Sequence, residues 1–157
     1  MTESFQEQEL TKQSLGWYRA KFNTLDSPTI AEMNGRFHSE FVGPGLLSTF
    51  EPYGLAILMG GIWQGKIFDG NGHGMNIVRR KGVSHETMPV VLKKEVSLLN
   101  GRSGLNITYP SGSRFPWPWV VDEIRWLNED TLLGMTLVTK AGLYRLALPF
   151  FLHKNKE

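Results

Sequence analysis

The chain has 157 residues, of which 41% are hydrophobic and 20% charged. It is therefore long enough for one domain with a substantial core and too apolar to be intrinsically disordered. The net charge is only +2, which argues against nucleic acid as a partner, because such proteins normally carry a basic stripe. The chain has no cysteine, which excludes disulfides, thiolate chemistry and cysteine-ligated metal sites.

No segment resembles an export signal or a membrane span. The N-terminus is polar, and the longest apolar run, Leu55 to Met59, is far shorter than the ~20 residues that a membrane-spanning helix needs. We therefore expect a cytoplasmic protein with a single domain over residues 1–157. A helical segment is expected at 1–34 and a β-barrel at 35–153.

The N-terminal part of the sequence has a helical pattern. Apolar residues recur at near-helical spacing over about Glu9 to Leu25, which predicts one amphipathic helix. Asp26-Ser27-Pro28 ends it, and a short helical turn is expected at Thr29 to Met33. From Gly35 the apolar period changes to two, except at Leu46 to Met59. This apolar stretch is predicted to be a short helix or crossing segment over the end of a sheet.

The remaining sequence consists of strand-like segments joined by turn residues, such as Asp69 to Gly72 and Asn100-Gly101. Short connectors make neighbouring strands antiparallel, because parallel strands need a longer crossover. We expect a mostly β fold in which about eight strands close into an up-and-down barrel, since closure removes exposed edges. A two-sheet sandwich is the alternative. The expected strands are Gly35–Val42, Gly61–Phe68, His73–Arg80, Met88–Leu99, Gly104–Pro110, Trp119–Leu127, Thr131–Val138 and Leu143–His153.

The more apolar face of each strand is expected to line the barrel interior. A barrel of about eight strands is either filled by side chains or holds one small ligand. The many aromatic and methionine side chains favour a ligand. The expected inward-facing residues are Phe37, Phe41, Trp63, Ile67, Met75, Ile77, Leu105, Ile107, Tyr109, Val120, Ile124, Trp126, Leu133, Met135, Leu137, Tyr144, Leu146, Leu148 and Phe150.

The same assignment of strand faces places two charged residues, Arg79 and Asp122, toward the interior. A lone buried charge is unfavourable, so each needs a partner. We expect them to pair with each other or to form the polar end of a ligand site; alternatively, both lie near strand ends in solvent. The predicted ligand-binding residues are Phe41, Met75, Arg79, Tyr109, Trp117, Asp122, Trp126 and Met135.

The segment from Tyr109 to Trp119 (YPSGSRFPWPW) is unusually rich in aromatic residues and proline. Proline fixes φ and donates no backbone hydrogen bond, so a rigid irregular connection is expected. Phe115, Trp117 and Trp119 need cover. They are expected either to plug one end of the barrel or to form a lid over a ligand entrance.

Sequence motifs of known catalytic and metal sites are present only in incomplete form. Gly70 to Gly74 lacks the last glycine of a phosphate-binding loop, and His85-Glu86 lacks the second histidine of a zinc protease. Gly101 to Gly104 lacks the last glycine of a nucleophile elbow. His38 and Glu40 share a strand face, but no third metal ligand is indicated. We therefore expect neither a metal nor a cofactor.

The residues Gly61 to Gly65 (GIWQG) resemble the GxWxG opening strand of lipocalin-like barrels. Asp130 to Val138 and Ala147 to Lys154 resemble the closing part of the GXWXG family of uncharacterised bacterial and fungal proteins. The resemblance covers about the last two thirds of the chain. It implies a lipocalin-like barrel and a small hydrophobic ligand. It also implies that Trp63 packs at the closed barrel end, under a basic residue for which Arg145 is the candidate.

The motif also opens haem-binding nitrobindin-like barrels, which need a proximal histidine inside the barrel. The late candidate for that ligand is His153, and we do not expect haem.

The leading hypothesis is the binding of a small hydrophobic ligand, lipid-like, terpenoid or aromatic, inside the barrel. The first alternative is an enzyme of isomerase, cyclase or dehydratase type acting on an apolar substrate in the same cavity. Asp122 would be its general acid or base, with Arg79 or Tyr109 stabilising developing charge. The second alternative is a filled barrel that acts as an interaction subunit. The sequence does not indicate the oligomeric state.

Overall fold

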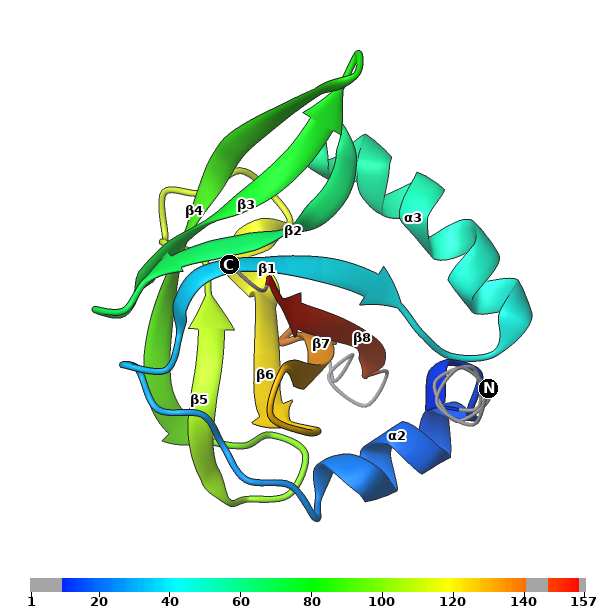
Figure 1. Cartoon of the computed structure of the whole chain (residues 1–157), viewed down its shortest axis with the longest axis vertical. Coiled ribbons are helices and arrows are strands. Elements are labelled where there is room, and N and C mark those ends of the chain that lie inside the picture. The colour runs from blue at the N-terminus through cyan, green and yellow to red at the C-terminus, as the bar shows by residue number, and fades with distance from the viewer. Residues whose placement is uncertain (1–9, 141–146, 156–157) are drawn as a thin grey trace.

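A computed structural model describes residues 10–140 and 147–155. Eight antiparallel strands form one closed barrel, in which each strand pairs with the next and β8 pairs with β1 (Figure 1). This order confirms the predicted mostly β, up-and-down barrel over the sandwich alternative. The strands are β1 (Asn34–Phe41), β2 (Ile62–Asp69), β3 (His73–Arg80), β4 (Val83–Val96), β5 (Ser103–Thr108), β6 (Val120–Trp126), β7 (Thr131–Val138) and β8 (Leu148–Lys154).

The helices differ in part from the prediction. The single helix expected over Glu9 to Leu25 is wrong in extent, because helical residues 10–11 are separated by a break from α2 (Leu15–Phe22). Ser14 causes the restart: its side chain accepts a hydrogen bond from the backbone N–H of Trp17 at 3.1 Å, which caps the new helix. The helical turn expected at Thr29 to Met33 is a hydrogen-bonded turn.

The apolar stretch between β1 and β2 forms helix α3 (Gly45–Met59), which follows the outside of the barrel (Figure 1). Gly60, with a φ of 72°, ends the helix in the left-handed conformation that glycine adopts readily. A short 3-10 turn, η1 (Trp117–Trp119), precedes β6. The fold is thus a barrel with helices packed on its outer surface.

Helix α2 covers the outer face of β7 and β8. Tyr18 and Phe22 of the helix share a buried cluster with Leu133 and Met135 of β7. The expected inward orientation of Leu133, Met135 and Leu137 is therefore wrong, and Leu132 takes the interior side. The physical reason is that β7 is covered on both faces. The residues on both faces are therefore apolar, and the sequence pattern does not show which face points into the barrel.

The barrel interior is packed with side chains. Its core includes the predicted Phe37, Leu105, Ile107, Ile124 and Phe150, all at most 3% exposed. Tyr144, Leu146 and Arg145 lie outside the residues that the structure describes.

One end of the barrel is closed by the segment between α2 and β1. The backbone N–H of Trp126 donates to Asp26 O at 2.8 Å, and that of Leu105 donates to Ser27 Oγ at 2.8 Å. Met33, fully buried, packs into the interior core behind this segment. The residues discussed next lie toward the opposite end, where β5 ends and β6 begins.

Candidate functional site

A lysine lies in the middle of this barrel. Lys66 of β2 is 1% exposed, and its Nζ donates hydrogen bonds to Asn76 Oδ1 at 2.7 Å and to Tyr109 Oη at 3.3 Å. The same ammonium lies 3.6 Å from Asp122 Oδ2. Because a buried cation without partners would be strongly destabilising, these contacts are what allow Lys66 to remain in the core.

Asp122 is the anionic partner in this network. It is 5% exposed and accepts a hydrogen bond from Thr136 Oγ1 at 2.8 Å. Burial raises the pKa of the Asp122 carboxyl, and the charge of Lys66 only partly opposes the rise. The inward orientation predicted for Asp122 is correct. Its partner is Lys66 and not Arg79.

Asn76 and Tyr109 extend the network toward the wall of the barrel. Asn76 donates from Nδ2 to Tyr109 Oη at 3.2 Å and to Met88 O at 3.0 Å, and it accepts from Trp63 Nε1 at 3.1 Å. Burial is the main cause that raises the pKa of Tyr109. The Tyr109 phenol therefore stays protonated at neutral pH, held by two donors.

A backbone irregularity explains why Lys66 faces inward against the simple alternation. The pairing of β2 with β3 shifts between Trp63 and Gly65, so Lys66 lies on the same face as Trp63. Its ammonium is 5.4 Å from the centre of the Trp63 ring. The expected inward orientation of Ile67 is therefore wrong, and Phe68 is buried in its place.

Strand β3 likewise presents the face opposite to the one predicted. Asn76 and Val78 are fully buried and face the core, whereas Met75 is half-buried on the other side. Arg79 is exposed, so its expected inward orientation is wrong. Its neighbour Arg80 is the residue whose side chain reaches the site described next.

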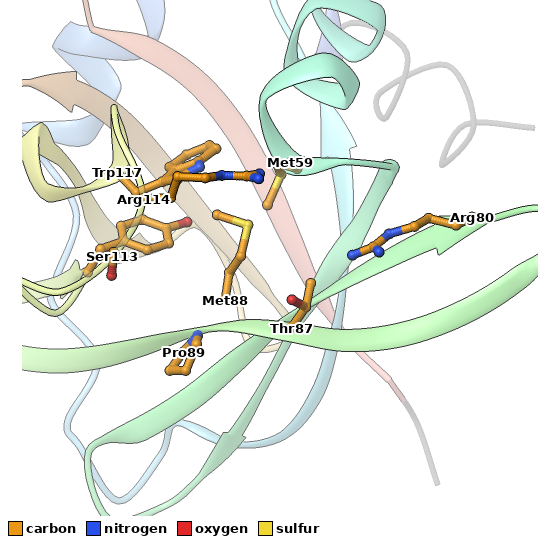
Figure 2. A pocket seen from close by; sticks show the side chains of 9 residues that line it. Met59, Arg80, Thr87, Met88, Pro89, Ser113, Arg114 and Trp117 are labelled. Atoms are coloured by element: carbon orange, nitrogen blue, oxygen red, sulfur yellow. The ribbon is translucent and has the colours of Figure 1, made fainter.

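A cavity of about 290 Å³ lies above Tyr109, at the end of the barrel. Figure 2 shows Met59, Met88, Arg114 and Trp117 converging on this space, with Arg80 reaching in from β3. The volume is just below the ~300–1,000 Å³ that is typical of ligand pockets. The lining residues are Met59, Arg80, Thr87, Met88, Pro89, Tyr109, Ser113, Arg114 and Trp117.

Met88 enters the cavity wall through a distortion of β4. Thr87 pairs with Asn76 and Pro89 pairs with Met75, so Met88 is an extra residue in the ladder, with a φ of 56°. A non-glycine residue at positive φ is strained, and such strain is typical of sites where a bulge redirects a side chain. The bulge holds its carbonyl against Asn76 while its side chain lines the cavity.

Two guanidinium groups stand at the polar side of the cavity. Arg114 donates from Nη2 to Leu58 O at 3.4 Å, at the C-terminal end of α3, and Arg80 lies beside Gly60 and Gly61. In the described part of the chain, no carboxylate lies within 4.0 Å of either group. Apolar walls with two unneutralised cations are suited to an anionic amphiphile.

The segment from Tyr109 to Trp119 packs over this end of the barrel; whether it acts as a lid stays a prediction. Trp117 is 5% exposed and packs on Tyr109, with ring centres 5.0 Å apart, so it plugs this end of the barrel. Ser113 and Arg114 line the cavity from above. Phe115 does not find the expected cover and is 68% exposed.

Among the predicted ligand-binding residues, Tyr109 and Trp117 line the cavity. Asp122 lies beneath it, joined to Tyr109 through Lys66. Phe41 and Trp126 are half-buried and pack against the interior core. Met75, Met135 and the exposed Arg79 are absent from the cavity wall. Lys66, Asn76, Met88, Arg80 and Arg114 were missed; the glycine inside β2 was a signal for the bulge that turns Lys66 inward.

His38, Glu40 and His153 gather on the outer face of the barrel. The imidazole rings of His38 and His153 stack 4.9 Å apart, and His153 Nε2 lies 2.9 Å from Glu40 Oε1. Leu152, next to His153, faces the interior core, so His153 points away from it. Across residues 10–140 and 147–155, no group of three histidine or carboxylate side chains has an arrangement that could hold a metal.

Comparisons with known proteins support the fold alone. The structure resembles the crystal structure of a protein from Thermomonospora curvata, with a TM-score of 0.70 and 16% sequence identity over 99% of this chain and 97% of that one. No family model and no curated protein matches the sequence. Membership of the GXWXG family therefore stays a prediction from the motif.

Proposed function

We propose that this protein binds a small apolar ligand that carries an anionic group, in the cavity lined by Tyr109 and Trp117. The observation that carries the proposal is the composition of the wall. Met59, Met88 and Trp117 supply apolar surface, while Arg80 and Arg114 bring two positive charges without a carboxylate partner in the described residues. This specifies more closely the hydrophobic ligand expected from the sequence, and it moves the site from the barrel centre to one end.

The buried network below the cavity supports this proposal by fixing the cavity floor. Lys66 and Asn76 both donate to the Tyr109 hydroxyl, so the ring is held in one orientation before a ligand arrives. A preformed wall reduces the ordering that binding requires. The enzyme alternative has less support, because Asp122 does not line the cavity and Arg79 is exposed on the surface.

The test compares octanoate with octan-1-ol by isothermal titration calorimetry. The two share an apolar chain and differ in charge. At roughly 0.4–0.5 kcal/mol per non-hydrogen atom, a ligand of this size binds with a Kd on the order of 0.1–1 mM. We expect octanoate to bind about tenfold more tightly than the alcohol, because only the carboxylate pairs with the guanidinium groups.

Three variants locate the site. Arg114→Gln and Arg80→Gln are expected to weaken octanoate binding about threefold each and to leave octanol binding unchanged. Arg79→Gln is the matched control, since this arginine is exposed and does not line the cavity. Met88→Trp, which fills the cavity, is expected to abolish binding of both ligands. Equal loss in Arg79→Gln, or full affinity in Met88→Trp, would show that the ligand binds elsewhere.

A further inference from the structure

We propose that the C-terminal end of helix α3 and the adjoining loops form a surface that docks on an anionic lipid bilayer. Four apolar side chains are exposed there: Ile57 at 84%, Leu58 at 43%, Ile62 at 50% and Phe115 at 68%. We call these four residues the α3-end patch. Large aliphatic and aromatic side chains gathered at such exposure mark an interaction site.

The segments of the patch adjoin one another at the end of α3: only Gly60 and Gly61 separate the helix from Ile62, and one hydrogen bond joins the helix to the loop before η1. Arg114, which precedes Phe115, donates to Leu58 O, so the loop before η1 lies against the end of α3. Ile62, at the start of β2, pairs with Arg79 of β3. The hairpin of β3 and β4 projects beyond the barrel next to this end of α3 (Figure 1).

Basic side chains surround the patch. Arg79, Arg80 and Lys81 are consecutive and exposed at the hairpin end, and Arg114 is exposed beside Leu58. No ion pair to a carboxylate involves them in the part of the chain that the structure describes. An apolar surface with a cationic rim is the combination that inserts between lipid headgroups and is attracted by anionic lipids.

Charge distinguishes the bilayer from a second copy of the chain. A two-fold interface would place the same patch of both copies together and bring their arginines face to face. We also expect the end of α3 to contact the membrane surface and not to cross the bilayer. In the described residues no helix is long and apolar enough to cross one, and the 15 residues of α3 span only about 22 Å.

The docked orientation would direct the cavity at the lipid, because Met59, Arg80 and Arg114 belong to both the cavity wall and the surroundings of the patch. An amphiphile with an anionic head could then pass from the headgroup layer into the protein without crossing bulk water. This last step depends on the proposed function, whereas the docking surface does not.

The experiment is co-sedimentation of the full chain with vesicles of phosphatidylcholine alone or mixed with phosphatidylglycerol. We expect binding to the mixed vesicles that falls with added salt, and little binding to phosphatidylcholine. Ile57→Asp and Phe115→Asp should each abolish sedimentation. Val96→Asp is the matched control, because Val96 is 64% exposed at the end of β4 and does not belong to the patch.

A charge-removing pair tests the rim. Arg79→Gln/Lys81→Gln is expected to weaken binding to the mixed vesicles about fivefold for each charge removed. The control Lys93→Gln/Lys94→Gln removes two exposed charges from the C-terminal part of β4 and is expected to retain binding. Neither residue of the first pair lines the cavity, so octanoate affinity should be unchanged in it. If the wild-type protein binds the mixed vesicles but does not bind octanoate, the proposed function is refuted and the docking proposal is not.

Three results would overturn the docking proposal. They are no sedimentation with the mixed vesicles, equal losses in the test and control variants, and a wild-type dimer in analytical ultracentrifugation that Ile57→Asp disrupts. The last would assign the patch to a second copy. Phe115 lies on a loop outside the barrel strands, so Phe115→Asp remains informative if Ile57→Asp perturbs α3; circular dichroism identifies that case.

Discussion

The pair formed by Lys66 and Asp122 is predicted to be strongly coupled, so that either single substitution destabilises the protein and the double substitution largely restores it. In Lys66→Met, the buried Asp122 carboxylate loses its cation. It then either stays ionised in the core or takes up a proton. Proton uptake at pH 7 by a carboxyl with an ordinary pKa of 3.8 costs about 4 kcal/mol, which sets the upper limit of this penalty.

This value agrees with the roughly 3–5 kcal/mol observed when one partner of a buried ion pair is removed. Asp122→Asn leaves Lys66 without its anion and is expected to lose a similar amount. In Lys66→Met/Asp122→Asn neither charge remains, and Thr136 can still donate to the asparagine carbonyl. The double variant should lose only about 1–2 kcal/mol, from the hydrogen bonds of Lys66 to Asn76 and Tyr109.

Urea unfolding of the four proteins at pH 7 measures these free energies in a double-mutant cycle. The pH dependence provides the control. Asp122 in Lys66→Met has a raised folded-state pKa, so its stabilising contribution is complete below the ordinary value near 3.8 and is lost as the pH rises. The penalty of Lys66→Met should therefore shrink as the pH is lowered below 7, by at most about 1.4 kcal/mol for each pH unit. Additive losses in the double variant would refute the coupling.

Two further predictions concern α3 and the strand bulge. Burial raises the pKa of Glu51 to about 7, and its Oε2 has no hydrogen-bond partner in the described structure. The protonated Glu51 therefore contributes to folding stability fully below pH 4.5, and this contribution is lost as the pH rises through 7. Discounted for partial solvent access, the wild type should lose about 1–2 kcal/mol between pH 5 and 8 in thermal or urea unfolding, and Glu51→Gln should remove that loss. Gly65 has a φ of 143°, and a Cβ there would lie 2.0 Å from Phe37 O, so Gly65→Ala should destabilise the barrel by about 3 kcal/mol or more. Gly112→Ala, where nothing lies within 4 Å, should stay within about 0.5 kcal/mol of the wild type, and equal effects of the two alanines would contradict the close approach of β1 and β2.

The barrel could be predicted from local sequence because most connectors are short and pair neighbouring strands; the exceptions are helix α3, between β1 and β2, and the segment between β5 and β6. Asn100-Gly101 and the other turns determine the strand order without reference to distant contacts. The inward orientation of Asp122 also followed from simple alternation, because β6 has no bulge in its pairing with β7.

The site could not be predicted in the same way, because it depends on departures from alternation. The bulges at Gly65 and Met88 decide which residues of β2 and β4 face inward. Gly65 signals the first of them, but the register shift that each bulge causes is seen only in the pairing of two strands. Arg114 reaches the cavity through an irregular loop whose path is set by its contact with Leu58. Such tertiary contacts have no periodic signal in the sequence.

The central claim is that a ligand occupies the cavity above Tyr109, and methyl NMR of the methionines tests it most directly. Met59 and Met88 line the cavity, whereas Met33 lies in the core at the closed end and Met135 lies beneath α2. In a titration with octanoate, we predict shifts of the Met59 and Met88 methyl resonances with a common Kd, while Met33 and Met135 stay unchanged. Shifts of Met33 or Met135 without those of Met88, or no shifts at all, would contradict the claim.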